Sequence, residues 1–206
     1  MIRTVIFDLA EVLIAGLWGV ENDLADLFGV TAEDIIANLG GEIMDDYCRG
    51  RMSEEEYWQR TIRRCGWPAH IERAKAAVRS NFRRTVPGSE SIVRELAGQR
   101  YRVCLLSDHG REWIDFVRTV HPLLDLFDRR FFSFDLDAVK REPVAFERML
   151  SQLDADPGEC LFIDDQDQNL RVAREVGLTG VRFTGADDLR GELIRLGIRC
   201  NPPAIG

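Results

Sequence analysis

The chain has 206 residues, 45% of them hydrophobic and 30% charged, and its 27 basic and 35 acidic residues give a formal net charge of −8. This length and apolar content are enough for one substantial core, alone or with a small accessory layer. The negative charge disfavours nucleic-acid binding, which depends mainly on Lys and Arg neutralising phosphates, but a small phosphorylated ligand needs only a local positive pocket.

Short apolar runs predict five buried strands. Runs that are apolar throughout and rich in Val, Ile and Phe suit strands covered by helices on both faces. Helical patterns separate the later runs, which implies βαβ crossovers and a parallel sheet. In chain order the strands are predicted at residues 4–7, 103–106, 130–132, 160–163 and 180–183, and the helices at 89–98, 112–120, 144–153, 169–176 and 187–196.

The alternation is interrupted once, between Leu13 and Pro87, where helix signals replace strand signals. Thr31-Ala-Glu-Asp34 and Ser53-Glu-Glu-Glu56 are typical of helix starts, and the second is typical of a capping box. We predict about four helices inserted directly after the first strand. The expected organisation is an α/β core domain of residues 1–14 and 86–206 and a helical cap domain of residues 15–85.

The N-terminus is not typical of a secretory signal, because Asp8 and Glu11 interrupt its apolar stretch. The uncharged run that follows, residues 12–20, is too short to span a bilayer. Five scattered cysteines without a C-x-x-C pair indicate neither a disulfide framework nor a zinc site. We therefore predict a cytoplasmic protein that has no membrane partner.

Polar side chains follow the predicted strands at the edge where an open parallel sheet binds its ligands. A single Asp at a strand end is more often a turn or N-cap residue. The set is different, because it combines carboxylates, a hydroxyl, an imidazole and an ammonium group at one edge. Its members are Asp8, Ser107, Asp108, His109, Lys140, Asp164 and Asp165.

This combination suits phosphoryl transfer. The Asp8 carboxylate cannot approach a phosphate unaided, because the two anions repel each other. A hard divalent ion such as Mg²⁺ prefers oxygen ligands of this kind and would remove the barrier. Lys140 and Ser107 could then neutralise and position the transferred oxygens.

Four ordered motifs resemble those of the haloacid dehalogenase (HAD) superfamily, in the branch with a helical cap inserted after the first strand. In chain order the motifs are Val5-Ile-Phe-Asp8-Leu-Ala-Glu-Val-Leu13, Val103-Cys-Leu-Leu-Ser107-Asp108, Lys140-Arg-Glu-Pro-Val-Ala-Phe146 and Leu161-Phe-Ile-Asp164-Asp165-Gln-Asp-Gln-Asn169. The resemblance covers nearly the whole chain and is greatest to sugar-phosphate phosphatase-like members. It implies a Rossmann-like core, a mobile cap, Mg²⁺ as cofactor and a small phosphorylated metabolite as substrate.

The resemblance also implies residue roles. Asp8 would be the nucleophile that becomes an aspartyl-phosphate, and Ser107, Asp108 and Lys140 would contact the phosphoryl group. Trp18 is a candidate for facing the substrate, although a position in the cap core is the more ordinary interpretation. The implied metal shell is Asp8, the backbone carbonyl of Ala10, Asp165 directly, Asp164 through water, and Asn169 in support.

The chain departs from the family pattern where the general acid usually stands. Ala10 replaces an Asp that protonates the leaving group, a contribution worth about 10²–10⁴-fold in rate. Glu11 and His109 are candidate substitutes, and the imidazole has the more suitable intrinsic pKa, about 6.5. Otherwise each is an ordinary loop residue.

The charge balance at the same edge is also unusual. Glu11 and Asp108 add negative charge where a phosphate must lie, and Arg141, in place of the usual Pro, offsets one of them. This balance predicts weaker phosphate binding than in a standard member of the family.

Two other functions stay open. Halide departure needs no proton, so a 2-haloacid dehalogenase would tolerate Ala10, but the acidic pair with Asn169 is typical of a metal site. The second alternative is a catalytically weak binding or interaction protein. Arg49 is interpreted as a cap salt-bridge residue rather than a substrate clamp, and the substrate and the oligomeric state are left open.

Overall fold

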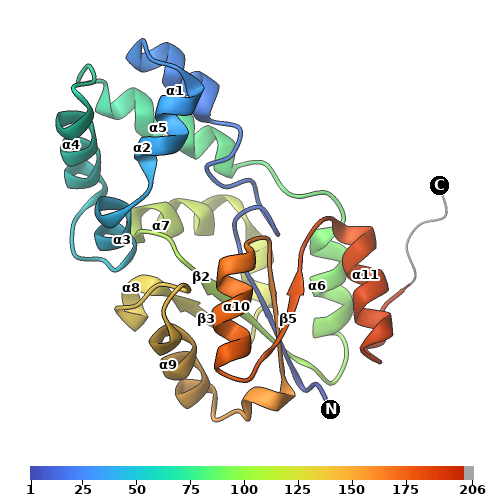
Figure 1. Cartoon of the computed structure of the whole chain (residues 1–206). Coiled ribbons are helices and arrows are strands. Elements are labelled where there is room, and N and C mark those ends of the chain that lie inside the picture. The colour runs from blue at the N-terminus through green and yellow to red at the C-terminus, as the bar shows by residue number, and fades with distance from the viewer. Residues whose placement is uncertain (202–206) are drawn as a thin grey trace.

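Within residues 1–201, which the computed structural model describes, five parallel strands form one sheet in the order β3-β2-β1-β4-β5 (Figure 1). All five predicted strands are confirmed, with ends displaced by at most one residue. Residues 202–206 of the predicted core domain lie outside the described part. The strands are β1 (Thr4–Phe7), β2 (Arg102–Ser107), β3 (Arg129–Phe132), β4 (Cys160–Asp164) and β5 (Thr179–Arg182).

The central strand β1 is fully buried and pairs with a strand on each side. Val5 is in register with Val103 of β2 and with Leu161 of β4. The chain builds β2 and β3 on one side of β1 and then crosses to build β4 and β5 on the other. The carboxyl end of β1 is therefore the switch point at which such sheets bind ligands, and Asp8 follows it directly.

Helices cover both faces of the sheet, as the alternation of side chains along β1 requires. Val5 and Phe7 belong to one hydrophobic cluster, and Ile6 between them belongs to the other. The first cluster includes residues of α6 (Ser89–Ala97), α7 (Arg111–Val120) and α11 (Ala186–Arg195), and the second includes residues of α9 (Pro143–Leu153) and α10 (Asp167–Glu175). All five predicted core helices are confirmed, with ends within two residues.

Short elements that the apolar pattern did not predict complete the core. They are the 3₁₀-helices η1 (Pro122–Leu126) and η2 (Pro157–Glu159) and the four-residue helix α8 (Ser133–Leu136).

Five helices, not about four, lie between β1 and α6 and stand above the sheet edge (Figure 1). Only Gly40 and Gly41 divide α2 from α3. Gly41 has φ 82°, a left-handed conformation that glycine adopts without a steric penalty, so the chain turns sharply here. The helices are α1 (Glu21–Phe28), α2 (Ala32–Leu39), α3 (Glu42–Cys48), α4 (Glu54–Cys65) and α5 (Ile71–Phe82).

Both predicted helix starts are confirmed, but the capping box begins α2 rather than α4. The Asp34 backbone N–H donates to Thr31 Oγ1 at 3.1 Å, and the Thr31 N–H donates to Asp34 Oδ2 at 3.3 Å. At α4, Ser53 Oγ accepts from the Glu56 N–H at 3.2 Å. The Glu56 carboxylate instead pairs with Arg60 one turn further on, so the reciprocal half of the box is lost.

The segments that enter and leave the inserted helices lie side by side. The Ala15 N–H donates to the Arg84 carbonyl and the Val86 N–H donates to the Leu13 carbonyl, both at 2.9 Å. Among the described residues, every helix lacks the combination of length and apolar character that a bilayer crossing requires.

Candidate active site

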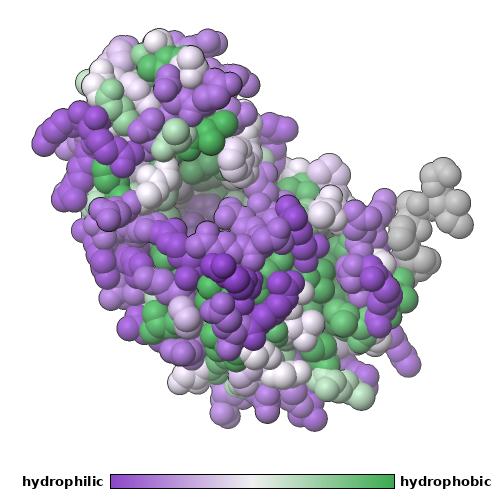
Figure 2. All heavy atoms as spheres, viewed as in Figure 1, coloured by the Kyte–Doolittle hydropathy of each residue, from purple (hydrophilic) through white to green (hydrophobic). Residues whose placement is uncertain are grey.

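A cavity of about 340 Å³ lies between the carboxyl edge of the sheet and helices α1–α3. It opens as the hollow between the upper and lower parts of the molecule (Figure 2). Most of the predicted site residues line it: Asp8, Ala10, Glu11, Trp18, Asp108, His109, Lys140, Asp165 and Asn169. The other two, Ser107 and Asp164, are fully buried beneath the lining.

Lys140 is the centre of the charged floor of the cavity. Its ammonium Nζ lies 2.7 Å from Asp8 Oδ1 and 2.7 Å from Asp164 Oδ2, and all three side chains are buried. Burial alone would lower the pKa of Lys140, but the Asp164 and Asp8 carboxylates raise it above its usual value, so the ammonium stays charged. The lysine thus fixes the nucleophile candidate against β4.

Three carboxylates are close enough together to hold one metal ion. Asp8, Asp164 and Asp165 each place one oxygen within 4.8 Å of the others. Burial raises the pKa of Asp8 well above its usual range, and burial and Asp164 together raise the pKa of Asp165 to about 6. One ammonium against three carboxylates leaves surplus negative charge, which a divalent cation with oxygen ligands would offset. The residues present therefore fit Mg²⁺.

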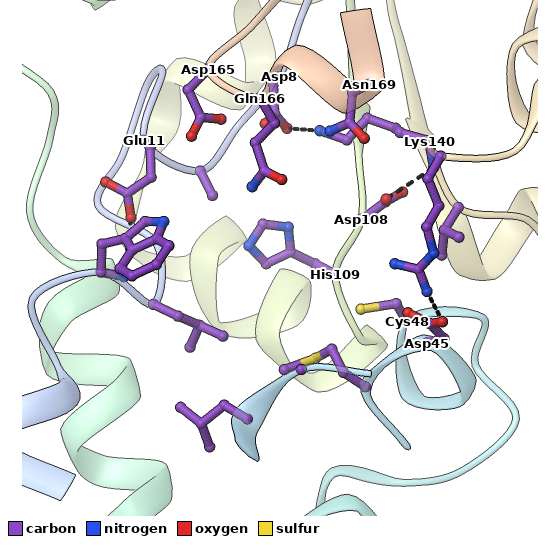
Figure 3. A pocket seen from close by; sticks show the side chains of 18 of the residues that line it. Asp8, Glu11, Asp45, Cys48, Asp108, His109, Lys140, Asp165, Gln166 and Asn169 are labelled. Carbon is purple, nitrogen blue, oxygen red and sulfur yellow. Dashed lines mark hydrogen bonds and ion pairs between the residues drawn. The ribbon is translucent and has the colours of Figure 1, made fainter. Parts of the chain in front are cut away.

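Neighbouring groups orient Asp164 within this cluster. The Gln166 N–H donates to Asp164 Oδ1 at 2.8 Å, and the Asn169 amide donates to both carboxylate oxygens at 3.2 Å. In Figure 3 the Asn169 and Gln166 side chains lie beside Asp8 and Asp165 on the core side of the cavity. Asn169 thus acts on the cluster through Asp164.

Glu11 lines the cavity, but its carboxylate also organises a loop. Glu11 Oε1 accepts hydrogen bonds from the backbone N–H groups of Gly16 at 2.8 Å and Trp18 at 3.2 Å. Glu11 has φ 59°, a strained conformation for a non-glycine residue that these two bonds help to hold. Burial raises its pKa above the ordinary value.

His109 is buried and lies between the polar floor and the inserted helices (Figure 3). Its Nδ1 is 2.6 Å from Ser107 Oγ, so the predicted phosphate contact Ser107 pairs with the imidazole beneath the cavity lining. Burial, with a smaller contribution from the Lys140 charge, lowers the pKa of His109 to about 3. The ring is therefore neutral near pH 7.

Asp108 presents an unsatisfied atom at the cavity. Its Oδ2 accepts the Lys140 backbone N–H at 2.9 Å, whereas Oδ1 is buried and has no partner among the described residues. Burial raises the pKa of Asp108 to about 6, because water no longer solvates the charged form.

Two arginines join the inserted helices to the core. Arg49, directly after α3, pairs with Glu142 at 2.6 Å, which agrees with its interpretation as a salt-bridge residue. Arg141 pairs with Asp45 of α3, so its charge faces the cap rather than Glu11 or Asp108. The sequence did not indicate either partner, because both pairs join residues that are distant in the chain; Arg49 and Glu142, for example, are 93 positions apart.

The remaining cavity residues that the sequence did not single out are mostly apolar and come from the inserted helices and the loop before them. They include Leu17, Ile35, Ile36, Leu39 and Met44. Their sequence signal, apolar residues at helical spacing, is the same as that of an ordinary helix core.

Comparison with known proteins identifies the family. The family model of haloacid dehalogenase-like hydrolases matches residues 2–177.

The chain belongs to the haloacid dehalogenase-like hydrolase family.

Relatives of this hydrolase include enzymes named as phosphatases. It is 27% identical over 188 residues to a sesquiterpene phosphatase of Aspergillus oryzae, covering 88% of this chain and 90% of the relative. It is 27% identical over 210 residues to the D-ribitol-5-phosphate phosphatase of Bacteroides thetaiotaomicron, covering 94% of this chain and 97% of the relative.

The hydrolase also shares its fold with a HAD family enzyme of Bacteroides thetaiotaomicron solved with magnesium and inorganic phosphate. The two structures superpose with a TM-score of 0.76 and 22% identity, covering 93% of this chain and 99% of the other. The parallel α/β fold and the family resemblance expected from the sequence are therefore confirmed.

Proposed function

We propose that this hydrolase is a Mg²⁺-dependent phosphatase that cleaves a small phosphate monoester through an aspartyl-phosphate on Asp8. One observation carries the proposal: the Lys140 ammonium bridges Asp8 and Asp164 at a cavity where a third carboxylate, Asp165, completes a metal-binding group. The phosphatases among the relatives support this reaction class.

In the proposed reaction, an Asp8 carboxylate oxygen attacks phosphorus and the ester oxygen departs with the alcohol. Water then attacks the aspartyl-phosphate, which releases inorganic phosphate and regenerates the carboxylate. Lys140 stabilises the charge on the transferred oxygens throughout. Asp8, Asp164 and Asp165, with the Ala10 carbonyl and Asn169 in support, would hold Mg²⁺, which neutralises charge between the two anions.

We propose Glu11 rather than His109 as the substitute proton donor. Ala10 has no ionisable group, and the low pKa of His109 leaves its ring without the extra proton that an imidazolium would donate. Glu11 lines the same cavity and is fixed there by two backbone hydrogen bonds. His109 would then help to position Ser107.

The segments that pair at residues 13–15 and 84–86 support a division into a core of residues 1–14 and 86–206 and a cap of residues 15–85. We propose that the cap closes the cavity during the reaction and excludes water. A cytoplasmic location stays a prediction.

Replacing the nucleophile tests the proposal. The Asp8→Asn variant should lose at least about 10³-fold in kcat on phosphate esters with Mg²⁺, because an amide is a poor nucleophile. The exposed Asp26→Asn in α1 is the matched control and should retain full activity. Phosphate release is the measurement.

Absent activity, or equal activity of wild type and Asp8→Asn, would refute the phosphatase. Chloride release from 2-haloacids without metal would instead favour the dehalogenase, and ligand binding without turnover would favour the binding protein.

A further inference from the structure

The cavity is chemically two-sided. Its core side carries the charged cluster around Asp8 and Lys140, together with Gln166, Gln168 and Asn169. Figure 3 shows Asp8, Gln166 and Asn169 gathered on one side of the cavity, facing side chains that are mostly carbon on the other. The apolar side is formed by Leu17, Ile35, Ile36, Leu39 and Met44.

The cap side of the cavity carries two carboxylates, Glu21 and Asp45, and each has one partner within the protein. Glu21 accepts the Gly19 N–H at 2.6 Å through Oε2, and Asp45 pairs with Arg141. A polyhydroxylated substrate would therefore meet few hydrogen-bonding groups on this side. Its hydroxyls would lose hydrogen bonds to water without replacing them, which is unfavourable.

The charged residues that line the cavity also disfavour a second anionic group on the substrate. In the described part of the chain, Lys140 and Arg141 are the only basic residues lining the cavity. Lys140 is held by Asp8 and Asp164, and Arg141 by Asp45. A second phosphate or a carboxylate on the substrate would find no free cation among the residues that line the cavity, and it would face Glu21 and Asp45.

Two large apolar side chains remain exposed at the cavity. Trp18 is 53% exposed and Ile36 is 48% exposed, although both line the cavity. An isolated exposed apolar residue needs no explanation, but two that share one site with a buried apolar wall indicate a binding surface.

We infer that the alcohol part of the substrate is an apolar hydrocarbon group, which packs against the cap wall while the single phosphate monoester lies at Asp8. This inference rests on the proposed phosphatase function and narrows its substrate class. It differs from the sugar phosphates that the sequence resemblance favours, because the cap wall is mostly apolar and offers few polar partners for sugar hydroxyls.

Two primary-alcohol esters test the substrate class with Mg²⁺ present: n-octyl phosphate, used below its micelle concentration, and ribitol 5-phosphate. The octyl ester should have a kcat/KM at least about tenfold higher, because burying several methylenes outweighs the loss of polar contacts. An equal or higher value for the ribitol ester would overturn the inference and leave the phosphatase intact.

The affinity of non-hydrolysable phosphonates tests the apolar wall independently of catalysis. Octylphosphonate and methylphosphonate resist hydrolysis, and calorimetry can measure their Kd on the wild-type protein with Mg²⁺. Tighter binding of octylphosphonate without ester turnover would support the apolar wall and refute the phosphatase. Equal affinity of the two phosphonates would overturn the inference even if esters are hydrolysed.

A matched pair of variants locates the contact. Ile36→Ser at the cavity should raise the Kd of octylphosphonate about fivefold and leave that of methylphosphonate unchanged. Ile194→Ser in α11 alters a side chain of similar exposure, 45%, that does not line the cavity, and should change neither. Met44→Gln is a second cavity variant and should also raise the Kd of octylphosphonate. The same Kd of octylphosphonate for all three variants would overturn the inference.

Discussion

At the scale of single residues, burial sets the properties of the site. Asp8 and Lys140 are buried and Asp108 is half-buried beside them, so the pKa of each group depends strongly on burial and on the neighbouring charges. The sequence indicated which residue types meet here. It could not indicate that Ser107 lies beneath His109 or that Glu11 is tied to Gly16, because these contacts depend on loop conformation.

Restoring the missing acid tests the role of Glu11. Ala10→Asp should raise kcat about 10²-fold if the leaving group lacks an efficient proton donor. Glu11→Gln should lower the kcat of the wild-type protein. It should have little effect on the kcat of Ala10→Asp, because the new carboxylate would act as the proton donor instead. The measurement is kcat on one ester for wild type, Glu11→Gln, Ala10→Asp and the double variant. An equal loss of kcat from Glu11→Gln in both backgrounds would show that Glu11 acts only on loop structure.

Asp108 should make phosphate binding depend on pH. Below its pKa of about 6 the carboxyl is neutral, and above it the negative charge repels phosphate. Asp108→Asn should therefore tighten inhibition by inorganic phosphate at pH 8 and change it little at pH 5. A pH-independent effect of the variant on the inhibition constant would contradict this assignment.

The same group should affect stability. Its folded pKa lies above the value of about 3.9 in an unfolded chain, so its stabilising contribution is complete below that value and is lost as pH rises through about 6. Asp108→Asn should accordingly gain stability relative to wild type at pH 8 but not at pH 4, in urea unfolding.

At the scale of elements, local sequence signals placed the strands and core helices within two residues. They predicted about four inserted helices where the structure has five, and a capping box at α4, where Glu56 pairs with Arg60 rather than with the helix start. At α4 two nearby groups compete for the same carboxylate, and the pattern of apolar residues does not encode which one wins.

Helices α4, α5 and α7 meet at one buried carboxylate. Glu54 of α4 accepts from Arg79 of α5 at 3.1 and 2.5 Å and from the Trp113 indole of α7 at 2.8 Å. Trp113 also lines the cavity, so Glu54 holds part of the site across the boundary between cap and core.

Removing this carboxylate should destabilise the protein. Glu54→Ala leaves two donors without a partner and should cost about 2–4 kcal/mol in the free energy of unfolding. Glu55→Ala, on the same helix, removes a solvent-accessible carboxylate paired with Lys75 and should cost much less than Glu54→Ala. Urea unfolding at pH 7 measures both, and equal costs would contradict the role given to Glu54.

At the scale of the whole molecule, the cap and one face of the sheet share a continuous hydrophobic cluster. Ion pairs of Arg49 with Glu142 and Arg51 with Asp137 fasten the α3 side of the cap to the core. The cavity lies along this boundary, so its shape depends on how the two parts are joined.

The sequence by itself determined the parallel sheet and the charged cluster, because apolar runs are local and the ends of parallel strands share one edge. Asp8, Asp164 and Asp165 could be brought together by that rule, whereas Lys140 lies eight residues beyond the end of β3 and is placed with them by the motif resemblance. Only the tertiary structure decided the rest of the site. Ile35 and Ile36 are neighbours with the same chemistry and both line the cavity, yet Ile35 is buried and Ile36 is 48% exposed. Which apolar side chains meet a ligand depends on the packing of the cap against the core, and residues distant in the chain set that packing.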